Sequence, residues 1–237
     1  MYFLAHMYSL MKSLPIGISL ENILEPMILG CWSPDAGYFP HYSPELTKFS
    51  HTNNPPINLY GKTGIKARCF EIGWLTHIAC DELVHKEIFF SNGDPLCPLI
   101  IRNMGFKKLL TSSKIHLGRE IGLDVLLFQK INYWDWIGQI LFSKTTYTRQ
   151  KINFPGFKKI QNYVYNYVTK FLPIVNHDSS FSKVIKKVID YDFYNNQFLK
   201  EGIELIITKS QSICRSIIEE NLPKEIHKTT TKKRKDF

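Results

Sequence analysis

The segment GWLTHIACDELVH, residues 73–85, places three side chains that can bind a metal ion at intervals of four residues. These side chains are His77, Asp81 and His85, and most residues between them are apolar. Positions four apart on a helix differ by only ~40° in direction, so all three would lie within one ~80° sector. A carboxylate between two imidazoles in an apolar helix is costly unless a cation compensates it. The triple therefore favours a metal site, although each residue alone is more often structural.

Further histidines and carboxylates occur on both sides of this segment. His116 and Glu120 are four apart in IHLGREIGLD and would face one way on a helix, although such a pair is common on solvated faces. Asp35 falls in the Pro/Gly loop SPDAGYFP, where it could instead cap a turn. His51 stands where a helical pattern stops and could complement a helix C-terminus, while His6, one turn into the first helical segment, could be a core residue.

Taken together, these side chains form a coherent set of metal ligands. Imidazole and carboxylate without thiolate is the ligand mix of hydrolytic zinc sites, which leave positions open for water. The candidate ligands are His6, Asp35, His51, His77, Asp81, His85, His116 and Glu120. The five cysteines do not compete with this interpretation, because an odd number without C-x-x-C spacing indicates neither a disulfide framework nor a thiolate zinc site.

The elements that must position these ligands follow from hydrophobic periodicity and from Pro and Gly. Helical patterns cover about 2–12, 19–29 (with a kink or break expected at Pro26), 43–51, 64–90, 113–131, 156–172, 180–191 and 197–221. The connecting segments are CWSPDAGYFP, TNNPPINLYGKTG, SNGDPLCP and NFPG, and strand signals are scarce. We therefore expect an all-α, single-domain helical bundle over residues 1–222, followed by a basic disordered tail at 223–237.

Composition limits the class of protein and its partners. With 237 residues, 44% of them hydrophobic, the chain can bury one sizeable core. Its net charge of +9 favours anionic partners such as phosphates, acidic lipid surfaces or nucleic acid. The apolar start lacks a basic region and no run approaches ~18 apolar residues, so we expect a cytoplasmic protein without a signal peptide. The basic tail is either a solvated end or a peripheral contact with anionic membranes.

The order of these motifs resembles the zinc-dependent phospholipase C family. The resemblance rests on an early His, the "PD" loop, the "SH" at a helix end, GWLTHIACDELVH and the H-x-x-x-E segment, and it spans about residues 4 to 130. That family shares its all-helical fold with fungal single-strand-specific nucleases. The resemblance implies a zinc-dependent hydrolase that cleaves a phospholipid or a small phosphodiester. A single-strand nuclease, and a metal-binding protein without efficient turnover, are the alternatives.

The resemblance also implies how two of the zinc ions are held. The ligands that it assigns to the first ion are Asp35, His51, His77 and Asp81. Asp81 would bridge to a second ion, which His6 also holds. A metal-activated hydroxide would attack the phosphorus, and Asp35 would be the catalytic residue that steers the attacking water.

The resemblance also implies a third ion, whose ligands would be His85, His116 and Glu120. In the secreted members of the family, an N-terminal Trp completes the shell of this ion. Here Met1 precedes His6 by five residues without such a Trp, so we expect two or three zinc ions.

Two positions distinguish this chain from the phosphatidylcholine enzyme of the family. That enzyme has an aromatic residue directly after the loop Asp and another three residues before the "SH" histidine, and together they help to cage choline. Here the positions are Ala36 and Lys48. The resemblance therefore does not extend to choline, and Lys48 would favour an anionic group.

Overall fold

The helices of the protein are known from a computed structural model that describes residues 3–15, 20–36, 46, 48–84, 124, 127, 166 and 197–223. The helices in these ranges are α1 (Phe3–Ser13), α2 (Leu20–Ala36), α4 (Ile57–Tyr60), α5 (Gly64–Val84) and α13 (Gln197–Asn221). The described ranges contain no strand, so the all-α fold that the sequence predicts is confirmed. None of their helices combines the length and the apolar character that a bilayer-spanning segment needs.

Three of the predicted helices agree with the structure within the described residues. The first predicted helix corresponds to α1, the predicted helix at 64–90 corresponds to α5 as far as Val84, and the last corresponds to α13. In the predicted helices 113–131 and 156–172, only Asp124, Leu127 and Asn166 are described, and all three are helical. The predicted helix 180–191 lies outside the described residues, as does the tail from residue 224.

The second helix is longer than its sequence predicts. We expected it to end near residue 29 and placed Asp35 in a loop, but α2 continues through Pro26 and Pro34 to Ala36. Both expectations were wrong: the helix continues to Ala36, unbroken at Pro26, and Asp35 lies in its last turn. Each Pro removes one backbone hydrogen bond, at a cost of ~3 kcal/mol. Burial of apolar side chains such as Trp32, each stabilising by ~1.5–3 kcal/mol, offsets this cost.

The segment between α2 and α5 also differs from its prediction. Where the sequence indicates a helix at 43–51, Leu46 is helical but residues 48–51 form turns, in which the Phe49 N–H bonds the Leu46 carbonyl. Residues 57–60, which we expected to be part of a connector, form the short helix α4. It ends at Gly61, whose positive φ of 66° suits a residue without a Cβ.

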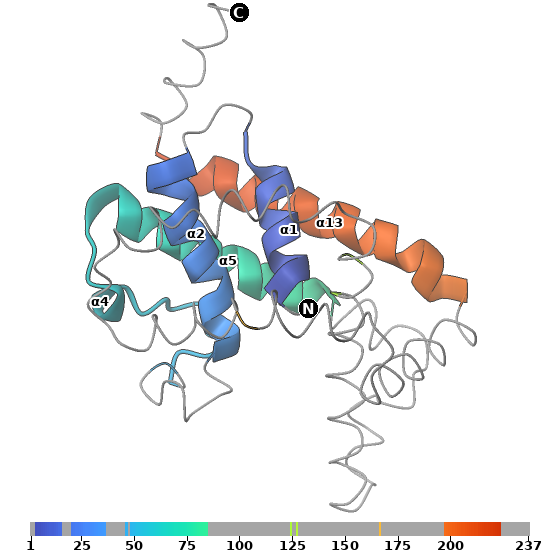
Figure 1. Cartoon of the computed structure of the whole chain (residues 1–237), viewed down its shortest axis with the longest axis horizontal. Helices are drawn as coiled ribbons and strands as arrows, with labels where there is room; N and C mark the ends of the chain where they lie inside the picture. The colour runs from blue at the N-terminus through green and yellow to red at the C-terminus, as the bar shows by residue number, and fades with distance from the viewer. Residues whose placement is uncertain are drawn as a thin grey trace, which may run out of the picture.

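The close packing of α2 on α5 is the central contact of the bundle (Figure 1). A Cβ built on Gly30 would lie 2.0 Å from the Phe70 carbonyl oxygen, and one built on Gly73 would lie 1.9 Å from the Met27 carbonyl oxygen. No side chain fits at either position, so the two helices touch backbone to backbone. This contact brings the C-terminal end of α2, with Asp35, beside α5.

The long helix α13 crosses α1 and α5 (Figure 1). The hydroxyl of Ser13, at the end of α1, donates to the carbonyl of Gln211 at 2.8 Å. On α5, the thiol of Cys80 lies 3.3 Å from that of Cys214, and both thiols are free and buried. Helices from the two ends of the described chain therefore share one core.

Candidate metal centre

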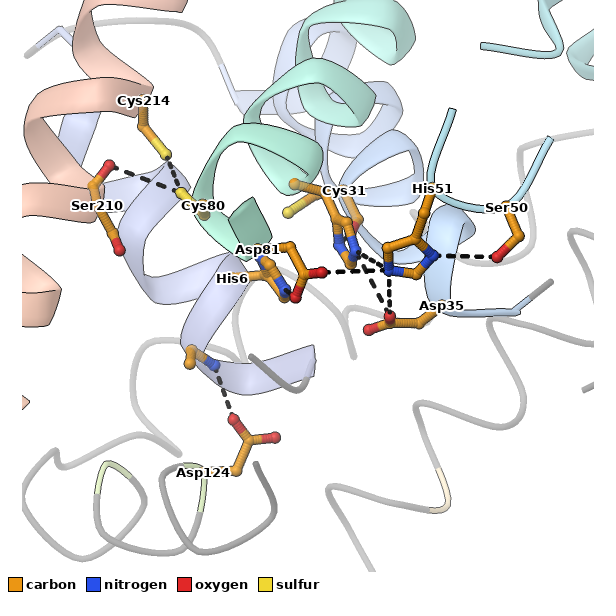
Figure 2. A network of polar contacts seen from close by, with 12 residues as sticks. His6, Cys31, Asp35, Ser50, His51, Cys80, Asp81, Asp124, Ser210 and Cys214 are labelled. Carbon is orange, nitrogen blue, oxygen red and sulfur yellow. Dashed lines mark hydrogen bonds and ion pairs between the residues drawn. The ribbon is translucent and has the colours of Figure 1, made fainter. Parts of the chain in front are cut away.

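Five of the eight candidate ligands converge at one place between α1, α2 and α5. The converging side chains are His6 from α1, Asp35 from α2, His51 from the turn before α4, and His77 and Asp81 from α5. Figure 2 shows His6, Asp35, His51 and Asp81 pointing toward one another. The other three candidates, His85, His116 and Glu120, lie outside the described residues.

Three of the converging atoms form a nearly equilateral triangle. His51 Nε2 lies 3.5 Å from Asp35 Oδ1, His77 Nε2 lies 3.4 Å from the same oxygen, and the two nitrogens are 3.5 Å apart. A tetrahedral zinc ion with bonds of ~2.0–2.1 Å separates neighbouring ligand atoms by roughly 3.3–3.4 Å. The triangle therefore has the dimensions of one face of a zinc coordination tetrahedron.

Asp81 connects this triangle to His6. One carboxylate oxygen, Oδ2, lies 3.5 Å from His51 Nε2, while the other, Oδ1, lies 3.9 Å from His6 Nε2. Each oxygen of Asp81 thus faces a different imidazole. A carboxylate in this position can bind two metal ions, one with each oxygen.

The orientation of His77 is set by the backbone of α2. Its Nδ1 lies 2.7 Å from the carbonyl oxygen of Cys31, which can only accept a hydrogen bond. Nδ1 therefore carries the proton, and the lone pair of Nε2 faces the triangle. Metal-binding histidines are commonly oriented in this way through their second nitrogen.

A relay through Ser50 orients His51. The Ser50 hydroxyl donates its only proton to the Pro34 carbonyl at 2.8 Å, so at 3.0 Å from His51 Nδ1 its oxygen must accept. This assigns the proton of the neutral imidazole to Nδ1 and leaves Nε2 as a ligand atom. His51 also adopts a φ of 53°, a left-handed conformation that costs about 1–3 kcal/mol in residues other than Gly. Trp74 steadies the turn by donating from Nε1 to the Thr52 carbonyl at 2.6 Å.

His6 is a buried imidazole with unsatisfied nitrogens. Its ring stacks on His77 at 3.8 Å between centroids, and among the described residues neither Nδ1 nor Nε2 has a hydrogen-bond partner. Burial, followed by the neighbouring His77, lowers its pKa well below the ordinary 6.5. Although Asp81 is within 3.9 Å, the ring is therefore neutral and forms no ion pair. A neutral, unsatisfied imidazole beside a carboxylate fits a site for a cation.

The pKa of His51 is shifted upward, in the opposite direction to that of His6. Burial lowers its pKa, but the hydrogen bond to Asp35 and the negative charges of Asp35 and Asp81 outweigh burial and raise the pKa above 6.5. At pH below this raised pKa, a proton on His51 offsets the negative charge of the two carboxylates in the metal-free protein. A zinc ion would take over this role with a larger charge.

Cys31 also lies close to two of these histidines. His6, Cys31 and His77 each offer a ligand atom, and these atoms lie within 4.8 Å of one another. Burial, and then the neighbouring Cys80 and Asp35, raise the pKa of the Cys31 thiol well above 9.0. A thiol that resists ionisation is a weaker ligand than the imidazoles and carboxylates around it.

The candidate ligands in the described residues differ in their exposure to solvent. The side chains of His6 and His77 are 0% exposed, whereas those of Asp35 and His51 are 11% and 20% exposed. A water molecule or a substrate would therefore meet Asp35 and His51 before it met the two fully buried imidazoles.

Several supporting residues are absent from the predicted set. The sequence gives no signal for the Cys31 carbonyl or for Trp74, because their roles depend on how α2 and the His51 turn pack on α5. For Ser50 the signal is its position directly before His51 in the "SH" pair. Asp124, whose carboxylate reaches the start of α1, could be recognised only as a further acid four residues after Glu120.

Comparison with known proteins identifies one family that matches most of the chain. The family described as zinc dependent phospholipase C matches residues 1–178, which include all eight candidate ligands. Among curated proteins and among solved structures, none matches the chain with significant similarity. The family match covers well over half of the 237 residues. With its helical fold and its cluster of histidines and aspartates, the chain belongs to the zinc-dependent phospholipase C family.

Proposed function

We propose that the protein is a zinc-dependent phosphodiester hydrolase that cleaves a phospholipid or a small phosphodiester. The observation that carries the proposal is the triangle of Asp35, His51 and His77, with sides of 3.4 to 3.5 Å. Two imidazoles and a carboxylate at these separations suit zinc, and the mixture of nitrogen and oxygen ligands is typical of hydrolytic sites.

The cluster is suited to two ions that share Asp81. The first would be held by the triangle and Asp81 Oδ2, and the second by Asp81 Oδ1 and His6. A third ion, held by His85, His116 and Glu120, is part of the proposal on the strength of the sequence motif alone. When bound, zinc lowers the pKa of water and offsets the charge that builds on phosphoryl oxygens during hydrolysis.

The residues of the chain would divide the remaining work. Asp35 is on the exposed side of the cluster, where its carboxylate would orient the attacking water and accept its proton. His77 and His51 are fixed by the Cys31 carbonyl and by Ser50, so the ligand atoms need little rearrangement. The buried side of the cluster, formed by His6 and His77, excludes bulk water.

Lys48 favours an anionic substrate. It is exposed and lies three residues before His51, in the turn that carries this candidate ligand. An ammonium group at this position attracts phosphate or carboxylate, and Ala36, at the end of α2, offers no aromatic face for a quaternary ammonium group. We therefore propose that an anionic head group is preferred over choline.

The test is hydrolysis by the full chain after it has been loaded with zinc. Vesicles of phosphatidylcholine, vesicles of phosphatidylglycerol, a chromogenic phosphodiester and single-stranded DNA would be compared, each with and without a chelator. We expect chelator-sensitive release of diacylglycerol, faster from phosphatidylglycerol than from phosphatidylcholine. Cleavage of DNA alone would instead identify the single-strand nuclease, and zinc binding without any turnover would identify a binding protein.

Asp35→Asn tests the proposed mechanism directly. It preserves the shape of the side chain but removes the charge that orients and deprotonates water, so turnover should fall by about 10²- to 10⁴-fold with most of the zinc retained. Glu219→Gln is the matched control, because this carboxylate is exposed on α13. If Asp35→Asn keeps its zinc and hydrolyses the best substrate as fast as the parent, Asp35 is structural and the mechanism is wrong.

A further inference from the structure

Asp124 comes from a distant part of the chain and contacts the residue before the candidate ligand His6. Its side chain is fully buried, and Oδ1 accepts a hydrogen bond of 2.9 Å from the backbone N–H of Ala5, 119 residues earlier (Figure 2). Leu127, three residues further along, is also buried. This contact joins the start of α1 to the segment that contains His116 and Glu120 in the sequence.

The contact supplies what the sequence of α1 lacks. The first four N–H groups of a helix have no partner within it, and Ala5 contributes one of them because α1 begins at Phe3. The first turn of α1 contains no acidic residue of its own. A carboxylate at this end satisfies the N–H group and complements the positive end of the helix dipole. Asp124 therefore caps α1 from outside the helix.

In the part of the chain that the structure describes, His6 lacks the hydrogen bonds that orient the other two histidines of the cluster. The nitrogens of His77 and His51 are fixed by hydrogen bonds, but neither nitrogen of His6 has one within the described residues. Its ring is located by the stack on His77 and by the backbone of α1, where it directly follows Ala5. The hydrogen bond from Ala5 to Asp124 thus helps to set the position of the His6 ring relative to Asp81.

We propose that Asp124 is a positioning residue for the second metal ion: it fixes the start of α1, and thereby places His6 against Asp81. The role rests on the zinc centre proposed above. In the sequence Asp124 follows Glu120 by four residues, so the predicted helix 113–131 would present both carboxylates on one face. Asp124 would then connect the predicted helix that carries His116 and Glu120 to α1, which carries His6.

The experiment measures zinc affinity and zinc content in Asp124→Ala, Asp124→Asn and Leu127→Ala. Loss of a residue that orients a metal ligand lowers metal affinity by about 10- to 100-fold, and we expect this loss for the more weakly bound zinc of Asp124→Ala. Asp124→Asn keeps an oxygen that can accept from Ala5 and should recover most of the affinity. Leu127→Ala leaves a cavity in the same segment and should lower the melting temperature without changing zinc affinity.

A double variant shows whether Asp124 acts through His6. In a His6→Ala background, which lacks the ligand, Asp124→Ala should cause no further loss of zinc affinity. Amide hydrogen exchange at Ala5 should be faster in Asp124→Ala and nearly unchanged in Asp124→Asn, whether or not zinc is bound. Equal zinc losses in Leu127→Ala and Asp124→Ala, or no loss in either, would overturn the role of Asp124. If the parent protein itself binds no zinc, the zinc centre is wrong, and Ala5 exchange then reports only on the cap.

Discussion

At the scale of single residues, the hydrogen bonds that orient the candidate ligands support a metal site as much as the ligand types do. His51 adopts a left-handed backbone that is unfavourable for its residue type, and Ser50 beside it uses its one proton on the Pro34 carbonyl. Both features have the same effect, which is to aim His51 Nε2 at Asp35, His77 and Asp81. Strain of this kind persists where the surrounding structure enforces it, and functional sites are the usual places.

Ser50→Ala should therefore weaken zinc binding without emptying the site. The substitution removes the acceptor for the Nδ1 proton of His51, and loss of such a partner typically costs 10- to 100-fold in metal affinity. Titration of the metal-free protein with zinc in the presence of a competing chelator would measure the change. Ser216→Ala, which removes an exposed hydroxyl bonded to Glu220 on α13, is the control and should bind zinc like the parent. Equal affinity in Ser50→Ala would show that the relay does not orient His51.

The raised pKa of His51 predicts how zinc binding depends on pH. Zinc must displace the proton that His51 carries below this pKa, so zinc affinity should rise with pH through the region above 6.5 and then level off. Calorimetry in buffers of different ionisation enthalpy should detect proton release on zinc binding near pH 6.5, and less release as pH rises above the raised pKa of His51. Affinity that is constant between pH 6 and 8 would contradict this prediction.

The contributions of His51 and His6 to the stability of the metal-free protein should depend on pH in opposite ways. The contribution of His51, whose pKa is raised, is fully present below 6.5 and is lost as pH rises through the raised value. His6, whose pKa is lowered, stays neutral while the unfolded chain takes up a proton, so its contribution is present above 6.5 and is lost as pH falls below it. Metal-free protein would thus lose stability on both sides of 6.5 from these two residues.

At the scale of elements, the separation of α2 and α5 sets the geometry of the centre. Gly73→Ala would place a methyl group 1.9 Å from the Met27 carbonyl, a backbone atom that cannot move aside alone. We expect the helices to be pushed apart, with a loss of about 3 kcal/mol in the free energy of unfolding and weaker zinc binding, because Asp35 moves away from His77. Thermal unfolding and zinc titration of the same preparation would test both effects.

Gly64→Ala is the matched control for this prediction. A Cβ there meets no other atom, and its cost, about 1 kcal/mol, comes from a φ of 60°. It should lower stability without lowering zinc affinity. If Gly73→Ala behaves like Gly64→Ala, the backbone contact does not control the metal centre.

The packing of α2 on α5 explains which elements could be predicted from the sequence and which could not. Helices α5 and α13 follow from their own patterns, because their residues form helices with few local obstacles. The extent of α2 could not be predicted, since Pro26 and Pro34 are local signals against a helix and the gain that outweighs them is burial against α5. Local sequence therefore indicated the wrong element for Asp35, even though it selected the residue.

The candidate site shows a similar division. His77 and Asp81 could be paired from the sequence because a single helix fixes their relative positions. The approach of His6 and His51 to them depends on contacts between helices, for which periodicity gives no distance. Their shared ligand chemistry placed these residues in one set, and the order of the motifs, matched to a family, added which ion each would hold. The placement of His85, His116 and Glu120 stays a prediction, as do the domain boundaries at 1–222 and 223–237.

At the scale of the whole molecule, the described core extends beyond the family match. The match ends at residue 178, yet α13, which begins at Gln197, packs against α1 and α5, two of the helices that carry candidate ligands. Its contacts with them include the Cys80 and Cys214 thiols, next to Asp81, and the hydrogen bond from Ser13. A helix beyond the matched residues thus packs against the helices that carry candidate ligands.

Charge over the whole chain leads to the last prediction, which concerns membranes. The net charge is +9, and residues 224–237 contain six Lys or Arg side chains against two acids. A basic side chain near an anionic bilayer contributes ~1 kcal/mol, so losing even two such contacts lowers binding more than tenfold. Deletion of 224–237 should therefore weaken binding to phosphatidylserine vesicles in low salt, while hydrolysis of a small chromogenic phosphodiester stays unchanged.

Sedimentation with vesicles measures this binding, and neutral phosphatidylcholine vesicles provide the control. Unchanged binding to the anionic vesicles would leave the tail as a solvated end without a role at membranes.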